Sequence, residues 1–303
     1  MKDSGLFSYQ NFVHAVAGST GSVIAMTAFY PLDTVRARLQ LEERRQAKGT
    51  LRTVQDLVQE EGCASLYRGV VPVLESLCVS NFVYFYTFHG LRRTFYLSSP
   101  SPLRDLGFGC LAGVINVLTT TPLWVVNTRL KFQGATFKVG ESLQRPKTDY
   151  QNLLDGLYKI YREEGTGALW AGTLPSLILV LNPAIQFMTY EALKRRSAGK
   201  NVGPLGYFLM GAVSKAIATV ITYPLQIIQA KLRYGHKYVG LSKDVSVLDL
   251  LRFIFRNQGV RGLYKGMEAK LLQTVLTAAL MFLCYEKIAA FVFRILATSR
   301  KAH

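Results

Sequence analysis

The stretch PLDTVRAR at residues 31–38 returns as PLWVVNTR at residues 122–129 and as PLQIIQAK at residues 224–231. In each copy a proline is followed seven residues later by arginine or lysine, and each copy follows an apolar run rich in small residues. A motif that recurs at intervals of about 100 residues marks an internal repeat, which decides the fold before any other feature does. The chain is therefore expected to consist of copies of one structural unit.

Two further elements recur between the proline elements, always in the same order. The first has a glycine, an aromatic residue five positions later and a second glycine two positions after that, at residues 62–69, 165–172 and 259–266. The second has an aromatic residue beside a polar residue, at residues 88–92, 190–194 and 285–289. This constant order predicts three repeats, which we place at residues 1–100, 101–200 and 201–303.

The composition indicates a bilayer rather than water as the main solvent of the protein. Of the 303 residues, 50% are hydrophobic and 18% are charged, and the mean hydropathy is +0.18. Apolar stretches long enough to cross a bilayer as helices lie at residues 12–40, 72–97, 104–133, 174–195, 204–234 and 268–297. These patterns predict an all-α membrane protein with six transmembrane helices, in which each repeat has a short amphipathic helix between its two spans.

Charge and cysteine usage narrow the classes of function. The net charge of +17 suits an anionic membrane surface, a nucleic acid or an anionic solute, and charge alone leaves these three open. The cysteines stand singly, which predicts small core residues in a reducing compartment: Cys63, Cys78, Cys110 and Cys284. No nucleophile elbow, Walker A, HExxH or paired-carboxylate motif occurs, so neither enzyme activity nor a metal site is expected. No removable targeting sequence is evident.

The proline and glycine–aromatic–glycine elements resemble those of the mitochondrial carrier family over essentially the whole chain. Within the family, the runs at residues 121–129, 182–187 and 268–273 resemble the peroxisomal carriers that exchange CoA, FAD, NAD and adenine nucleotides. The resemblance implies a three-fold pseudosymmetric bundle around one central site in the peroxisomal membrane. It also implies a monomer in the lipid bilayer that needs no cofactor, binds no nucleic acid, and has an import receptor for peroxisomal membrane proteins as a partner.

The same resemblance implies two polar gates that close the central site alternately. On the matrix-facing side it pairs Asp33 with Asn127, Trp124 with Gln229 and Gln226 with Arg36, and it makes Gln40 a brace for Asp33. On the cytosol-facing side it pairs His89 with Lys194, Glu191 with Ala289 and Glu286 with Arg92, with Tyr190 and Tyr285 as braces. Because most pairs lack one charge, both gates are expected to close weakly, which suits a membrane without a large electrical potential.

The resemblance also implies where the substrate binds. The family's contact positions fall near Ser76, Ile178, Leu179, Gln273 and Thr274, with a polar stripe at Tyr84, Asn182, Gln186 and Thr277. Lys270 and Lys215 are expected to bind phosphate, because a charge inside a span is costly enough to suggest a function. Alternatively, the stripe holds helices together, Lys215 snorkels and Lys270 lies near the interface.

Two other functions stay open at this point. One is a mitochondrial inner-membrane carrier of a different anionic metabolite. The other is a soluble helical-repeat scaffold that binds nucleic acid or protein through its basic surface. The basic pair Arg44 and Arg45 is expected to be solvated or to face lipid headgroups.

Overall fold

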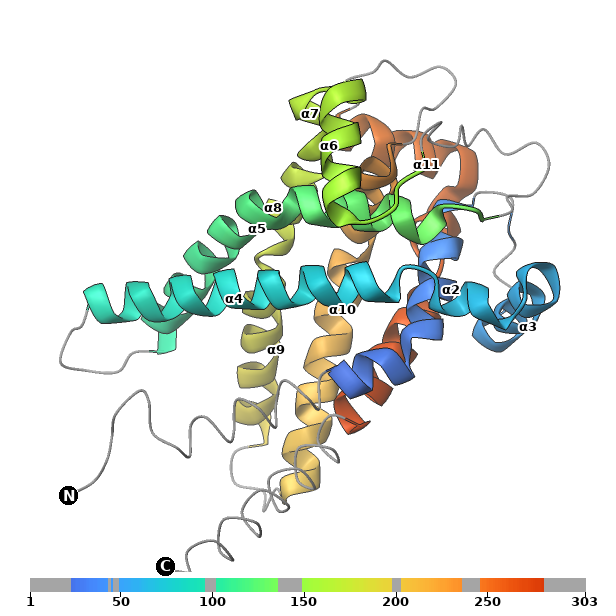
Figure 1. Cartoon of the computed structure of the whole chain (residues 1–303). Helices are drawn as coiled ribbons and strands as arrows, with labels where there is room; N and C mark the ends of the chain where they lie inside the picture. Colours follow the sequence, from blue (N-terminus) through green and yellow to red (C-terminus); the bar gives the residue numbers. More distant parts are fainter. Residues whose placement is uncertain are drawn as a thin grey trace, which may run out of the picture.

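The computed structural model describes residues 23–42, 45, 49–95, 102–135, 149–197, 203–235 and 246–280. These residues form helices joined by short turns and contain no strand (Figure 1). The helices are α2 (Tyr30–Leu41), α3 (Thr50–Glu61), η1 (Cys63–Tyr67), α4 (Val70–Thr94), α5 (Pro102–Phe132), α6 (Leu153–Glu164), α7 (Thr166–Leu169), α8 (Thr173–Leu179), α9 (Asn182–Arg196), α10 (Pro204–Tyr234) and α11 (Val247–Leu263). Residues 23–28 and 267–280 are also helical. The predicted all-α class is confirmed.

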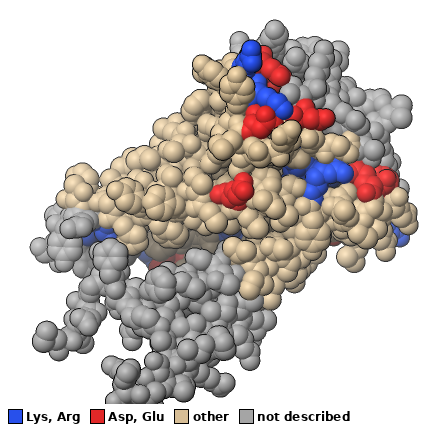
Figure 2. All heavy atoms as spheres, viewed as in Figure 1, with Lys and Arg blue, Asp and Glu red and all other residues tan. Residues whose placement is uncertain are grey.

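Within the described ranges, four helical stretches are long and apolar enough to cross a membrane: Cys63–Arg92, Leu103–Phe132, Thr166–Arg196 and Gly206–Tyr234. The expected first and sixth spans fall partly on residues 12–22 and 281–297, outside the described residues. Large apolar side chains on the spans are exposed, such as Phe82 at 70% and Tyr86 at 74%. Figure 2 shows a broad surface over α4 and α5 nearly free of charged residues, as a lipid-facing surface requires.

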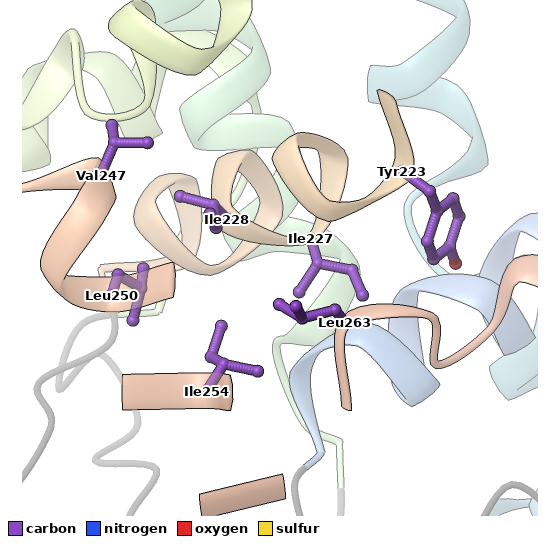
Figure 3. Close-up of a cluster of buried hydrophobic side chains, with 7 residues drawn as sticks. All are labelled: Tyr223, Ile227, Ile228, Val247, Leu250, Ile254 and Leu263. Atoms are coloured by element: carbon purple, nitrogen blue, oxygen red, sulfur yellow. The ribbon is translucent and has the colours of Figure 1, made fainter. Parts of the chain in front are cut away.

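In each repeat the short amphipathic helix packs on the span that carries the proline element. Leu57, Ile160 and Ile254 each stand five residues before the first glycine of their repeat's glycine element, and each is at most 1% exposed. Leu57 packs with Val35 and Ile160 packs with Val126. Ile254 packs with Ile227 and Ile228 in the third copy (Figure 3). The amphipathic helices α3, α6 and α11 thereby gather at one end of the bundle, which we call the proline end (Figure 1).

The second glycine of each glycine element lies where an even-numbered span begins and touches the next repeat. These glycines, Gly69, Gly172 and Gly266, have φ values of 76°, 78° and 80°. A Cβ atom on Gly69 would lie 3.1 Å from Lys131 Cα, and one on Gly172 would lie 3.2 Å from Arg233 Cγ. Both the positive φ and the close approach therefore require glycine. These contacts limit how closely the start of each even-numbered span approaches the proline-bearing span of the next repeat.

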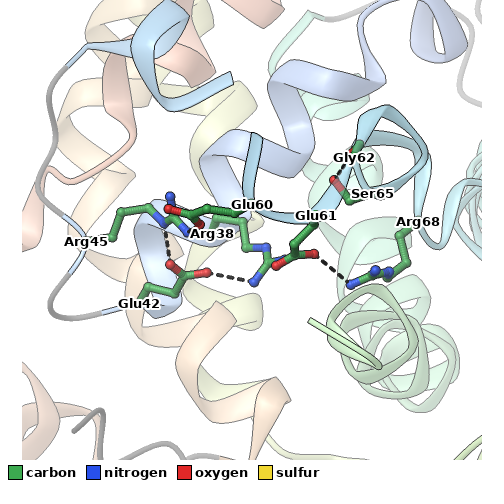
Figure 4. A network of polar contacts seen from close by, with 8 residues as sticks. All are labelled: Arg38, Glu42, Arg45, Glu60, Glu61, Gly62, Ser65 and Arg68. Atoms are coloured by element: carbon green, nitrogen blue, oxygen red, sulfur yellow. Dashed lines mark hydrogen bonds and ion pairs between the residues drawn. The ribbon is translucent and has the colours of Figure 1, made fainter. Parts of the chain in front are cut away.

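A buried ion-pair network joins α2 to α3 at the proline end (Figure 4). Arg38 pairs with Glu42 at 2.8 Å and with Glu61, and Arg45 pairs with Glu42 and with Glu60 at 2.6 Å. Burial lowers the pKa of Arg45, but hydrogen bonds to Glu42 and Glu60 outweigh this effect and raise it overall. The prediction that Arg45 is solvated is wrong, because Arg45 is 2% exposed and these acids neutralise it. Arg44 lies outside the described residues.

An apolar cluster closes the proline end on the axis. It joins the three spans that carry the proline element, through Leu41 of α2, Phe132 of α5 and Tyr234 of α10, with Ala37 beside them. Each of the three large side chains stands ten residues after the proline of its repeat. The rings of Phe132 and Tyr234 meet edge to face at 5.4 Å. We call these four residues the plug. Because the plug is apolar, it helps to exclude water from that end in addition to the ion pairs.

Candidate functional site

Asp33 lies at the centre of a buried polar cluster next to the plug. Its Oδ1 lies 2.9 Å from Arg36 Nη2, and its Oδ2 accepts a hydrogen bond from Lys131. Gln273 donates to Asp33 Oδ1 at 3.5 Å. Asp33 and Lys131 are each 7% exposed, and Gln273 is 5% exposed. One carboxylate therefore connects side chains from all three sequence repeats.

The partner of Asp33 differs from the one expected. Lys131 takes the place assigned to Asn127, whose side-chain Nδ2 and Oδ1 are buried and make no hydrogen bond to any described residue. Lys131 follows Asn127 by one helical turn of α5, beyond the end of the proline element. The sequence contains a signal for this exchange, because the position nine residues after the proline is occupied in the three repeats by Gln40, Lys131 and Arg233. The gate position of repeat two thus contains a cation that the motif does not include.

Gln40 braces a different neighbour from the one expected. Its Nε2 donates to the Tyr223 hydroxyl at 3.2 Å, and that hydroxyl donates to the Lys265 carbonyl at 2.8 Å. Gln40 therefore links α2 to α10 instead of supporting Asp33. Tyr30 occupies the position of Tyr223 in repeat one, where its hydroxyl donates to the Arg68 carbonyl at 3.0 Å. Both tyrosines directly precede the proline of their repeat and attach that span to the following even-numbered span.

The corner between repeats two and three contains a different set of side chains. The Arg233 guanidinium lies over the Trp124 ring, 5.9 Å from its centroid, and Nη2 donates to Ser176 Oγ at 3.2 Å. Gln229 Nε2 also donates to Ser176 Oγ, at 2.7 Å. The expected Trp124–Gln229 pair is therefore replaced by contacts through Arg233 and Ser176, which sequence reasoning missed.

Gln226 and Arg36, expected to face each other, each bond within their own helix. Gln226 Nε2 donates to Thr222 Oγ1 at 3.3 Å, whereas Arg36 pairs with Asp33 three residues earlier. The third corner of the proline end is therefore joined by the Gln40–Tyr223 hydrogen bond, together with the bond from Gln273 to Asp33. The corner between repeats one and two is closed by the Asp33–Lys131 ion pair. The corner between repeats two and three is closed by the contact of Arg233 with the Trp124 ring, and the corner between repeats three and one by hydrogen bonds such as that of Gln40 with Tyr223.

The opposite end of the bundle does not bring its expected pairs together in the described part of the chain. Arg92 approaches Asp105 at 3.9 Å, and Lys194 approaches Glu191 of its own helix at 3.9 Å. His89 is exposed, and Tyr190 and Glu191 are partly exposed. Tyr285 and Glu286 lie outside the described residues. In the described part of the chain, the proline end is therefore closed, whereas the expected pairs do not close the end where Arg92 and Lys194 lie, which we call the open end.

A cavity of about 470 Å³ opens between α4, α5, α8 and α10. Of the expected substrate residues, Tyr84 and Leu179 line it. Trp124, Ser176, Gln229 and Arg233 also line it, so the cavity reaches from the open end to the gate residues. This volume lies within the range of about 300–1,000 Å³ that is usual for small-molecule sites.

The other expected substrate residues lie around this cavity and the cluster at Asp33. Lys270 interacts electrostatically with Asp33, and its carbonyl accepts a hydrogen bond from Thr274 Oγ1 at 2.7 Å. Asn182 Nδ2 donates to Thr222 Oγ1 at 2.7 Å, so this residue does join helices, as the alternative interpretation held. Ser76 and Thr277 have buried hydroxyls without a hydrogen-bond partner in the described ranges. Lys215 and Gln186 are partly buried, and Ile178 is exposed.

The family described as mitochondrial carrier protein matches this chain three times, at residues 8–99, 98–201 and 200–295. The chain belongs to the mitochondrial carrier family. The predicted carrier fold in three repeats is confirmed, and membership makes the protein a transporter rather than an enzyme or a soluble scaffold. The proline-end and opposite-end residues described above are thus parts of one mitochondrial carrier bundle.

Relatives of this mitochondrial carrier cover nearly its whole length. It is 51% identical over 301 residues to the mouse peroxisomal membrane protein PMP34, with 97% of each chain covered. It is 32% identical to the Arabidopsis thaliana peroxisomal nicotinamide adenine dinucleotide carrier, over 91% of this chain and 94% of the relative. It is 30% identical to the Glycine max peroxisomal adenine nucleotide carrier 1, over 93% of this chain and 91% of the relative.

Proposed function

We propose that this carrier exchanges nucleotide-type cofactors across the peroxisomal membrane by alternating access. Its substrates in this proposal are CoA, FAD, NAD and AMP or ADP. The observation that carries the proposal is the 51% identity to a peroxisomal membrane protein over 97% of both chains. Two more distant relatives whose names specify dinucleotide and adenine nucleotide transport support the substrate class.

The charges of the proline end are consistent with an anionic substrate. Arg36, Lys131 and Lys270 surround the single carboxylate of Asp33, so the cluster carries excess positive charge among the described residues. A phosphate that enters from the open end would compete with Asp33 for these cations. This competition gives substrate binding a direct way to weaken the gate, since a ligand shifts a conformational equilibrium through its different affinity for the two states.

The expected substrate residues keep their roles within this proposal. Lys270 and Lys215 bind phosphate, Leu179 and Ile178 pack against the base, and Gln273 and Thr274 give hydrogen bonds. The carrier acts as a monomer in the bilayer without a cofactor, and an import receptor for peroxisomal membrane proteins delivers it. The charge-poor surface over α4 and α5 supports the bilayer part of this proposal (Figure 2).

Exchange in reconstituted liposomes tests the transport proposal. Purified carrier in liposomes loaded with AMP should take up labelled CoA, FAD, NAD or ADP, and liposomes without internal substrate should take up much less. Liposomes with heat-denatured carrier are the control. Transport of another anion but of no nucleotide would favour the mitochondrial alternative and contradict the proposal.

Localisation is tested separately in cells. A fluorescent protein fused to the N-terminus should give puncta that overlap a peroxisomal matrix marker. A reticular pattern that overlaps a mitochondrial dye would contradict the peroxisomal assignment without affecting the substrate assignment.

A further inference from the structure

The corner between repeats two and three reproduces the geometry of the Asp33–Lys131 corner with one charge missing. Lys131 and Arg233 stand at equivalent positions, nine residues after the proline of repeats two and three. Asp33 and Trp124 are equivalent too, two residues after the proline of repeats one and two. Lys131 pairs with Asp33, whereas Arg233 lies over the Trp124 ring at 5.9 Å. An indole thus occupies the position at which the first corner supplies a carboxylate.

Arg233 has no acidic partner in the part of the chain that the structure describes. Its Nη2 donates to Ser176 Oγ at 3.2 Å, and its Nε is buried without a hydrogen bond. Ser176 cannot neutralise the guanidinium, because its hydroxyl is uncharged, and this hydroxyl also donates to the Gly172 carbonyl at 2.5 Å and accepts from Gln229. A guanidinium in such surroundings favours an anion that accepts two parallel hydrogen bonds.

The cavity gives an anion access to this guanidinium. Arg233, Trp124, Ser176 and Gln229 all line the 470 Å³ cavity that opens toward the other end of the bundle. Among the described residues that line the cavity, Asp105 is the one acid, and it stands 19 residues before Trp124 on α5, roughly 28 Å along the helix axis. Asp105 therefore lies too far away to neutralise Arg233, and it approaches Arg92 instead.

Arg233 is also held in place from the side of α8. A Cβ on Gly172 would lie 3.2 Å from Arg233 Cγ, so the start of α8 packs closely against the aliphatic part of the Arg233 side chain. With the aliphatic part held by Gly172 and the guanidinium plane held by the Trp124 ring, the side chain has little freedom to leave the cavity. A pre-ordered cation of this kind binds a ligand without a large loss of side-chain entropy.

We propose that Arg233 is a specificity-determining residue that binds a phosphate group of the substrate, in addition to the phosphate contact proposed for Lys270. This inference rests on the proposed nucleotide-exchange function and adds a second phosphate contact to it. CoA carries a ribose 3′-phosphate apart from its pyrophosphate and can engage both Arg233 and Lys270, and the pyrophosphate of FAD or NAD offers two linked phosphates, whereas a nucleoside monophosphate offers one. Arg233 therefore favours the cofactors with several phosphates over AMP.

Transport kinetics in liposomes test the proposal with matched variants. Arg233→Gln should raise KM for CoA by about tenfold or more, because it removes hydrogen bonds to a charged group. Arg233→Lys, which keeps the charge but loses the planar geometry, should raise it less. Arg252→Gln on α11 is the control, because its side chain is 71% exposed and belongs to neither gate. The KM for AMP should rise less than the KM for CoA in Arg233→Gln.

Binding in detergent separates this inference from the proposed function. Pyrophosphate or CoA should raise the unfolding temperature of the wild-type carrier, and adenosine, which lacks phosphate, should not. Arg233→Gln should lose most of the pyrophosphate effect, while Arg252→Gln should keep it. If the wild type transports no nucleotide, the proposed function fails, but a pyrophosphate effect that depends on Arg233 still supports the anion site. Equal pyrophosphate effects and equal KM values in Arg233→Gln, Arg233→Lys and wild type would overturn the inference alone.

Discussion

The two corners formed by repeat two differ in how they hold the carrier closed. Toward repeat one, Lys131 of α5 pairs with the buried Asp33, and Gln273 adds a bond from repeat three. Toward repeat three, Trp124 of α5 meets Arg233, and no carboxylate is present among the described residues there. Equivalent positions in a pseudosymmetric bundle thus have different roles. The first corner closes the gate with an ion pair, whereas the second leaves the Arg233 cation facing the cavity.

The largest expected effect comes from breaking the first corner. Lys131→Met leaves Asp33 buried with Arg36 as its nearest remaining cation, so the free energy of unfolding should fall by about 3 kcal/mol. The unfolding temperature in detergent measures the loss. The double variant Lys131→Met with Asp33→Asn should recover part of it, because the buried side chain that lost Lys131 no longer carries a charge. Equal stability of Lys131→Met and wild type would show that this pair does not hold the gate.

The next effect concerns the cation beside the first corner. Lys270→Ala should lower kcat/KM for phosphate-bearing substrates by about tenfold, since it removes a charged hydrogen-bond donor from the site. Arg252→Gln serves again as the exposed control. Initial rates of CoA and ADP uptake into liposomes provide the measurement. Unchanged kinetics would remove Lys270 from the site while leaving the gate comparison intact.

A carboxylate placed in the second corner should make it behave like the first. Trp124→Glu puts an acid beside Arg233, which should stabilise the closed gate and slow transport by about threefold, the size expected of one partly exposed ion pair. Trp124→Gln has nearly the same shape without the charge and is the matched control. The differences in transport rate and unfolding temperature between Trp124→Glu and Trp124→Gln measure the effect of the added carboxylate charge. A faster or less stable Trp124→Glu than Trp124→Gln would contradict the comparison.

The smallest effect is expected at Asn127. Its amide atoms make no hydrogen bond in the described structure, so Asn127→Ala should change the free energy of unfolding by no more than about 1 kcal/mol. Transport should be close to that of the wild type. A loss as large as that of Lys131→Met would restore Asn127 as the partner of Asp33.

Much of the fold follows from local features of the chain. The proline elements, the two glycines of each glycine element and the long apolar stretches predict three helical repeats, and family membership confirms them. The glycines are informative because positive φ values at Gly69, Gly172 and Gly266 are a local backbone requirement. The burial of Leu57, Ile160 and Ile254 likewise follows from the helical period of each amphipathic segment.

The partners within the gates follow less directly from the sequence. Asp33, Trp124 and Gln229 stand at predicted gate positions, but Lys131, Arg233, Tyr223 and Ser176 were missed. The motif ends before Lys131 and Arg233, and Ser176 belongs to a helix that no gate motif includes. Arg45 was interpreted wrongly because its burial involves Glu60, at 2.6 Å and 15 residues away along the chain, as well as the nearby Glu42.

The sequence by itself determined the repeats and the helical stretches that carry the proline and glycine elements, because spacing along one helix is a local property. Only the tertiary structure decided whether Asn127 or Lys131 meets Asp33. The two candidates lie about 6 Å apart along α5, so a shift of one helical turn between neighbouring repeats exchanges them. That register is set where Gly69 touches Lys131, at a contact between two spans whose depth depends on the packing of the whole bundle.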